Sequence, residues 1–144
     1  MPQSDTEAGV TFSVPGPAAP QGSKRAFRTR SGRIALVESS NKVKPFRAAV
    51  AVAAVAAGAK PIDGAVAMRV AFIFMRPASH FMRSGALRAS APSHPGKPDL
   101  DKLARAVGDA LTGVCYRDDS QIVRWEMTKR YGAQASTEIS VLPA

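Results

Sequence analysis

Residues 97–113, KPDLDKLARAVGDALTG, contain the start, the buried face and the end of one predicted helix. Pro98 disfavours the helical region for the residue before it, so the helix can begin only after Lys97. From Leu103 the apolar residues recur at the spacing of one helical stripe, at positions 103, 107, 110 and 111. Gly113 readily takes the left-handed conformation that ends many helices. This stretch therefore predicts a helix near 102–112 that is entered through an extended segment.

Two pairs of acidic residues flank the predicted helix, in a chain with 20 basic and only 11 acidic residues. The first pair is two residues apart in the extended entry, so both carboxylates can face the same way. The helix dipole favours negative charge at that end. A helix followed by a strand, a turn and a second strand can bring the second pair back to the first, and such hard oxygen ligands favour Mg²⁺ or Mn²⁺. The candidate metal ligands are Asp99, Asp101, Asp118 and Asp119.

The same acidic residues also have an ordinary structural interpretation. Aspartates at a helix start are common caps, and Asp118-Asp119-Ser120 has the composition of a turn. Taken alone, the residues leave a metal site and a set of caps and turns as open alternatives.

A wider set of residues carries a family resemblance. It comprises Lys97-Pro98-Asp99-Leu100-Asp101, Leu103, Arg105, Asp109-Ala110-Leu111, Gly113 and Asp118-Asp119-Ser120-Gln121, with Arg76-Pro77-Ala78-Ser79-His80-Phe81 upstream. This set resembles the signature of the RusA-type Holliday junction resolvases, small endodeoxyribonucleases common in phages and prophages. The resemblance implies a homodimer with two active sites that resolves four-way DNA by paired phosphodiester hydrolysis in recombination and repair. It also implies action in the cytoplasm of a bacterial host, with a phage or prophage origin.

The resemblance assigns roles to individual side chains. Asp99, Asp101 and Asp119 are the expected catalytic carboxylates, and Arg105 or Lys102 is expected to contact the scissile phosphate. The chain has Lys102 where the family typically has Asn, and Arg105 where it typically has Lys. Arginine keeps the positive charge but cannot give up a proton. Asp109, four residues after Arg105, is expected to form an ion pair with it along the helix.

The net charge of +9 implies a polyanionic partner, and nucleic acid is strongly favoured over a membrane surface. Eight basic residues and one acid lie between Lys24 and Arg47, where two short strands at 26–29 and 33–37 predict a hairpin. Charges on such a hairpin can contact phosphates, or they can protect a sheet edge from pairing. The candidate DNA-binding residues are Lys24, Arg25, Arg28, Arg30, Arg33, Arg76, His80, Arg83, Arg88, Lys97 and Lys102.

The pattern of the whole chain predicts one α/β (α+β) domain over residues 10–144, after a disordered tail at 1–9. Strands are expected at 10–14, 66–75, 114–117, 121–131 and 137–142, in addition to the hairpin, and a further helix at 45–57. They should form a mixed sheet of about five or six short strands with two main helices packed on it. The 66–75 strand is expected in the centre, and the long basic loop at 76–98 is expected to be a mobile arm that orders on DNA.

Several other classes of protein are disfavoured. The single cysteine, Cys115, excludes an internal disulfide and is expected to be a small core residue. The polar N-terminus predicts no signal peptide, and the apolar tract at 48–59 is too short to span a bilayer. Two alternatives remain: a metal-dependent nuclease of another family, such as a restriction-type enzyme, and a basic DNA-binding protein without chemistry. Dependence of cleavage on Mg²⁺ separates the enzymes from the binding protein.

Overall fold

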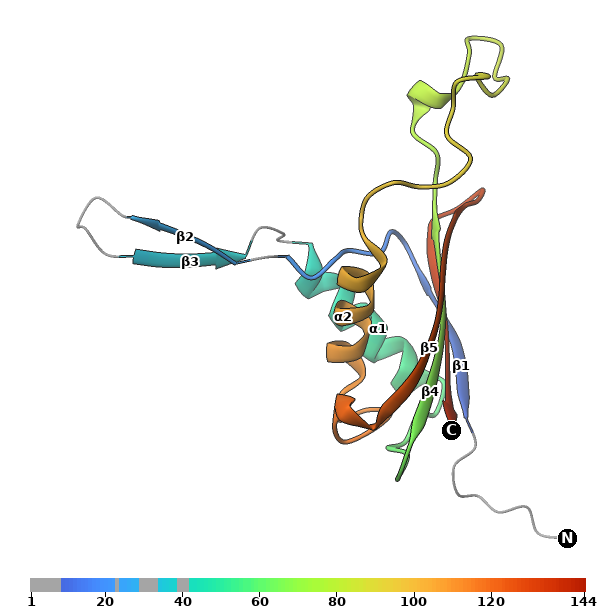
Figure 1. Ribbon diagram of the computed structural model, residues 1–144. Helices are drawn as coiled ribbons and strands as arrows, with labels where there is room; N and C mark the ends of the chain where they lie inside the picture. Colours follow the sequence, from blue (N-terminus) through green and yellow to red (C-terminus); the bar gives the residue numbers. More distant parts are fainter. Residues whose placement is uncertain (1–8, 23, 29–33, 39–41) are drawn as a thin grey trace, which may run out of the picture.

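The computed structural model describes residues 9–22, 24–28, 34–38 and 42–144 (Figure 1). Its main sheet has the strand order β1-β6-β4-β5, with β1 at Val10–Pro15, β6 at Ser136–Pro143, β4 at Val66–Phe74 and β5 at Ile122–Tyr131. β6 lies antiparallel to both β1 and β4, whereas β4 and β5 are parallel. The mixed α+β class and the interior place of β4 are therefore confirmed.

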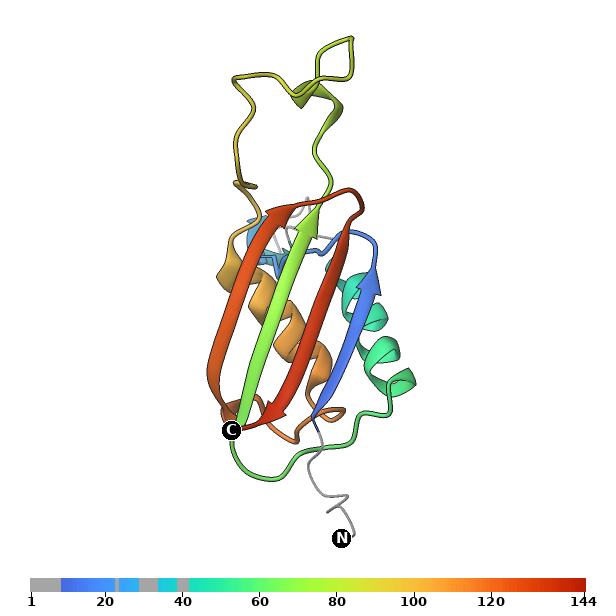
Figure 2. The ribbon, with the colours of Figure 1, turned by 90° about the vertical axis from the view of Figure 1, so that its right-hand side faces the viewer.

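The two helices, α1 (Val43–Ala56) and α2 (Leu100–Leu111), cover one face of this sheet and leave the other face open (Figure 2). The alternation along β4 explains this arrangement, because Val66, Met68, Val70 and Phe72 are buried while Arg69 between them is exposed. The buried side chains meet the apolar faces of the helices and form one core. Among the described residues, no helix is long and apolar enough to cross a bilayer.

Backbone hydrogen bonds close the end of helix α1 at Gly58. Gly58 has a φ of +87°, and the N–H groups of Gly58 and Ala59 donate to the carbonyls of Val55 and Ala54, at 3.0 Å each. This is the pattern of a helix end closed by a left-handed glycine. The predicted stop of the helix at Gly58 is thus confirmed, and α1 serves as scaffold beneath the sheet.

The segment after α2 is a tight turn, and the strand predicted at 114–117 is wrong. Gly113, with a φ of +84°, donates to the carbonyl of Tyr116 at 2.7 Å, and Cys115 donates to the carbonyl of Leu111 at 2.9 Å. The segment pairs with residues before β4 through an isolated bridge, in which the N–H of Ile62 donates to the carbonyl of Cys115 at 2.9 Å, and it forms no named strand. Cys115 is buried as expected, and this burial raises the pKa of its thiol to about 11.

The predicted hairpin is confirmed, but it forms a sheet of its own. β2 (Lys24–Arg28) pairs antiparallel with β3 (Ile34–Glu38), and the pair extends away from the body (Figure 1). The main sheet therefore has four strands, and the prediction of one sheet with five or six is wrong. Arg30 and Arg33 lie outside the described residues, as does the predicted tail apart from Gly9.

Residues 76–98 form an arm beyond one end of the sheet (Figure 2). The arm has internal structure, in contrast to the irregular loop that was predicted. It contains a short 3-10 helix, η1 (Ala78–His80), and an antiparallel bridge between Phe81 and Leu87. The N–H of Arg88 donates to the carbonyl of His80 at 2.9 Å, and that of Met82 to Ala86 at 2.8 Å.

Candidate active site

The first acidic pair lies where the arm enters α2. Asp99 is the N-cap residue, in an extended conformation, and Asp101 is in the first turn. The Asp99 side chain makes no capping hydrogen bond, and both carboxylates are exposed. The interpretation of this pair as ordinary caps is therefore disfavoured, because the Asp99 oxygens remain available to an external ligand.

Lys129 of β5 holds the backbone that leads to Asp99. Its Nζ donates to the carbonyl of Pro98 at 2.9 Å and also to that of Gly96. The ammonium thus fastens the last residues of the arm to the sheet immediately before Asp99. This role was not predicted from the sequence, although a lysine at a half-buried position of a strand was a possible signal for it.

The second acidic pair lies at a short 3-10 helix, η2 (Asp119–Gln121), just before β5. Asp118 is its N-cap, and the Asp118 carboxylate accepts a hydrogen bond from the backbone N–H of Ser120 at 2.9 Å. This bond is the main reason why the pKa of Asp118 lies below its usual range. For Asp118 the structural interpretation as a cap is confirmed.

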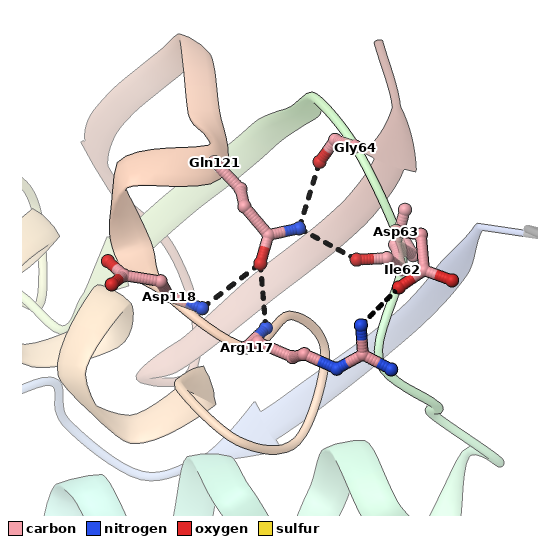
Figure 3. A network of polar contacts seen from close by, with 6 residues as sticks. All are labelled: Ile62, Asp63, Gly64, Arg117, Asp118 and Gln121. Carbon is pink, nitrogen blue, oxygen red and sulfur yellow. Dashed lines mark hydrogen bonds and ion pairs between the residues drawn. The ribbon is translucent and has the colours of Figure 1, made fainter.

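The side chain of Gln121 links the acidic turn, residues 118–121, to the segment that precedes β4 (Figure 3). Its Oε1 accepts from the backbone N–H groups of Arg117 and Asp118 at 2.8 and 3.0 Å. Its Nε2 donates to the carbonyls of Ile62 and Gly64 at 2.7 and 2.9 Å. Two acceptor bonds and two donor bonds use the full capacity of the amide. The spacing Asp118-x-x-Gln121 is that of a capping box and could have identified this residue from sequence.

An ion pair lies beside this network. The guanidinium of Arg117 is 2.7 Å from the carboxylate of Asp63, and both side chains are exposed (Figure 3). Such an exposed pair contributes little, about 0–1 kcal/mol. The amide of Gln121 is therefore the main polar link between the acidic turn and residues 62–64.

The structure places the two acidic pairs on separate elements, and their assembly around one metal ion stays a prediction. No group of three or more His, Cys, Asp and Glu side chains suited to a metal occurs in the described part of the chain. Asp99 lines a hollow with Lys97 and Lys102, whereas Asp119 lines a different hollow with Arg105 and Asp109.

Arg105 lies between the two pairs. It follows Asp101 by four residues, a rise of about 6 Å along α2, so both side chains lie on one helical face. The expected ion pair with Asp109 is absent, because Asp109 lies 3.9 Å from Arg47 of α1 instead. Arg105 is exposed and makes no ion pair within the described residues, so its guanidinium can meet a phosphate.

The predicted DNA-binding residues of the arm divide into two groups. Arg76, His80 and Arg88 brace the arm: Arg76 donates to the carbonyl of Pro92 at 2.7 Å and lies 3.3 Å from the His80 ring nitrogen, and Arg88 donates to the carbonyl of Ser79 at 3.1 Å. Arg83 and Lys97 are exposed and make no ion pair among the described residues. Contact with DNA stays a prediction for all of them.

Comparison with known proteins matches residues 15–142 to the family Endodeoxyribonuclease RusA. The chain is also 30% identical over 143 residues to YqaN, an uncharacterized protein of Bacillus subtilis (strain 168). That match covers 92% of this chain and 94% of the relative. The family match includes both helices, the arm and both acidic pairs, and it favours DNA hydrolysis over a binding protein without chemistry. The chain therefore belongs to the endodeoxyribonuclease RusA family.

Proposed function

We propose that this endonuclease resolves four-way DNA junctions in recombination and repair by Mg²⁺-dependent hydrolysis. The observation that carries the proposal is the state of the first acidic pair. Asp99 and Asp101 are exposed at the start of α2, and the Asp99 carboxylate is not used as a cap. Mg²⁺ in phosphate-processing sites is commonly held by one or two carboxylates, with waters and substrate phosphates as the other ligands. This donor set suits Mg²⁺, and Mn²⁺ has the same preference for oxygen.

Each side chain near the pair has a role in this proposal. When bound, Mg²⁺ supplies an activated water and neutralises charge on the phosphate. Asp99 and Asp101 hold the ion, and Lys129 keeps the backbone before Asp99 in place. Arg105, one turn further along α2, places a permanent positive charge at the scissile phosphate.

The proposed enzyme is a homodimer in which each copy carries its own acidic residues. Asp119 is the proposed third ligand, because it lines a hollow with Arg105, which follows Asp101 by one helical turn. The dimer also suits the substrate, because a four-way junction has symmetry-related strands that two active sites can cut together.

The test uses a synthetic four-way junction and a linear duplex of the same sequence, each incubated with purified protein in Mg²⁺ or in EDTA. We expect cleavage of the junction in Mg²⁺ only, and binding of the junction in both. Junction binding without cleavage in Mg²⁺ and Mn²⁺ would contradict the proposed chemistry. Equal cleavage of the linear duplex would contradict the proposed substrate.

A further inference from the structure

A hollow of about 450 Å³ lies at the root of the arm, where β4 ends and β5 ends beside it. It is distinct from the hollows lined by the acidic residues. The residues that matter for its chemistry are Met75, Arg76, Phe81, Leu87, Arg130 and Tyr131. Its volume falls in the range of about 300–1,000 Å³ that is typical of small-molecule sites.

The walls of this hollow are unusually apolar for an exposed surface. Met75 is 61% exposed, Phe81 37% and Leu87 48%. With Met82 of the same arm, they account for four of the seven large hydrophobic side chains that are exposed in the described residues. Such a concentration of exposed apolar side chains is typical of a binding surface.

The hollow is held open by interactions that do not involve a ligand. The Arg76 guanidinium lies 4.3 Å from the centre of the Tyr131 ring, and the His80 ring meets Tyr131 edge-on with centroids 5.6 Å apart. Arg76 also donates to the carbonyl of Pro92, in the part of the arm that returns toward α2, at 2.7 Å. A preformed site binds more tightly, because less conformational entropy is lost on binding.

The charges of the hollow select the ligand class. Two guanidinium groups, those of Arg76 and Arg130, line it together with no acidic residue. Arg130 is exposed and makes no ion pair among the described residues. A flat apolar wall beside arginines suits a ligand with both an aromatic face and a phosphate, which is the chemistry of a nucleotide.

We propose that this hollow binds an unpaired nucleotide of a branched DNA substrate, with the base against Phe81 and Leu87 and a phosphate at Arg130. This inference rests on the proposed function and names a binding site for part of its substrate. In linear duplex each base is paired and stacked on both faces, so removing one from the stack costs energy, whereas a base at a disrupted branch point costs less. The hollow therefore raises the affinity for branched DNA relative to linear duplex, whereas the positive charge of the protein attracts the phosphates of both.

The test uses a four-way junction with 2-aminopurine at the branch point, bound in EDTA so that no cleavage occurs. Stacking on an aromatic ring quenches this fluorescent base, and we expect wild-type protein to quench it. Phe81→Ala should abolish the quenching and lower junction affinity about tenfold, because removal of one base–aromatic stack has that order of effect. Affinity for linear duplex should be unchanged, and Phe81→Trp should keep both the quenching and the junction affinity.

Two matched controls separate the hollow from general effects. Val123→Ala removes an exposed apolar side chain at the other end of β5, and Arg124→Ala removes a cation from the same strand as Arg130. We expect Arg130→Ala to lower junction affinity more than Arg124→Ala does. The inference is overturned if Phe81→Ala quenches like wild type, or if it loses equal affinity for junction and duplex. A wild-type protein that quenches but cuts no junction in Mg²⁺ would instead contradict the proposed function and leave this binding site supported.

Discussion

The side-chain amide of Gln121 lies 2.7 Å from the backbone carbonyl of Ile62 and thereby fastens the acidic turn to the start of β4. β4 and β5 are parallel, and their first residues pair side by side. One amide therefore ties the turn that carries Asp118 and Asp119 to the segment that precedes β4.

Replacing Gln121 by Ala should release the acidic turn. The carbonyls of Ile62 and Gly64 would lose their donor, and the unfolding free energy should fall by about 1–3 kcal/mol. Junction cleavage should fall at temperatures well below the melting midpoint, while junction affinity changes little. Gln134→Ala, in the exposed turn after β5, is the matched control and should leave melting and cleavage as in wild type. Loss of stability with full cleavage would show that Gln121 does not position the site.

Asp101→Asn should abolish junction cleavage while affinity for the junction stays the same or rises. The substitution removes a metal-binding charge and also lowers repulsion toward phosphate. Glu138→Gln removes the same charge from β6 and should cut like wild type, because Glu138 is exposed on the open face of the sheet. Gel-shift affinity in EDTA and cleavage in Mg²⁺ measure the two effects. Cleavage by Asp101→Asn at the wild-type rate would exclude Asp101 as a ligand.

Replacement of Asp118 or Asp119 by Asn should have different effects on cleavage. Asp118→Asn keeps an oxygen that can accept from Ser120, so most cleavage should survive if Asp118 is only a cap. Asp119→Asn should lose cleavage if Asp119 is the ligand of this pair. Equal losses would assign both residues to the metal.

The lowered pKa of Asp118 gives this comparison a pH dependence. A carboxyl with a lowered folded pKa stabilises the protein above its unfolded pKa, about 3.9, and this stabilisation is lost as the pH falls through the folded value. Any melting difference between wild type and Asp118→Asn should therefore be present at pH 7 and disappear on acidification. A difference that persists at low pH would mean that the ionised cap is not its cause.

Arg105→Ala should lose cleavage without loss of stability, because Arg105 makes no ion pair among the described residues. Arg105→Lys should keep most activity, since binding a phosphate needs only a positive charge. Arg47→Ala, which removes the partner of Asp109, is a control for electrostatic changes around α2. Cleavage rates and melting temperatures of the three variants decide the matter. Near-normal cleavage by Arg105→Ala would remove Arg105 from the active site.

Replacing Arg28, Arg30 and Arg33 together by Ala should weaken DNA binding. The slope of log affinity against log salt should become shallower by up to about 0.9 for each phosphate that the variant no longer neutralises. Arg69→Ala with Arg124→Ala is the control, because both arginines pair with Glu126 on β4 and β5, away from the hairpin. An unchanged slope in the hairpin variant would place the DNA path elsewhere.

The sequence by itself determined most of the local elements and the family. Pro98 and Gly113 bracket α2, whose start was predicted two residues late, and the alternation of Val66, Met68, Val70 and Phe72 predicted the interior strand. These features depend on backbone sterics and on the period of apolar residues, both of which are properties of neighbouring residues in the chain. The family resemblance had the same source, since its motif lies almost wholly in one continuous segment.

Only the tertiary structure decided how distant segments combine. It made β2 and β3 a sheet of their own and turned residues 114–117 back toward α2. It also brought Lys129 to the carbonyl of Pro98 and Gln121 to that of Ile62. Those hydrogen bonds join residues more than 30 positions apart. No local period encodes them, because they follow from the pairing of strands and from the packing of helices on one face of the sheet.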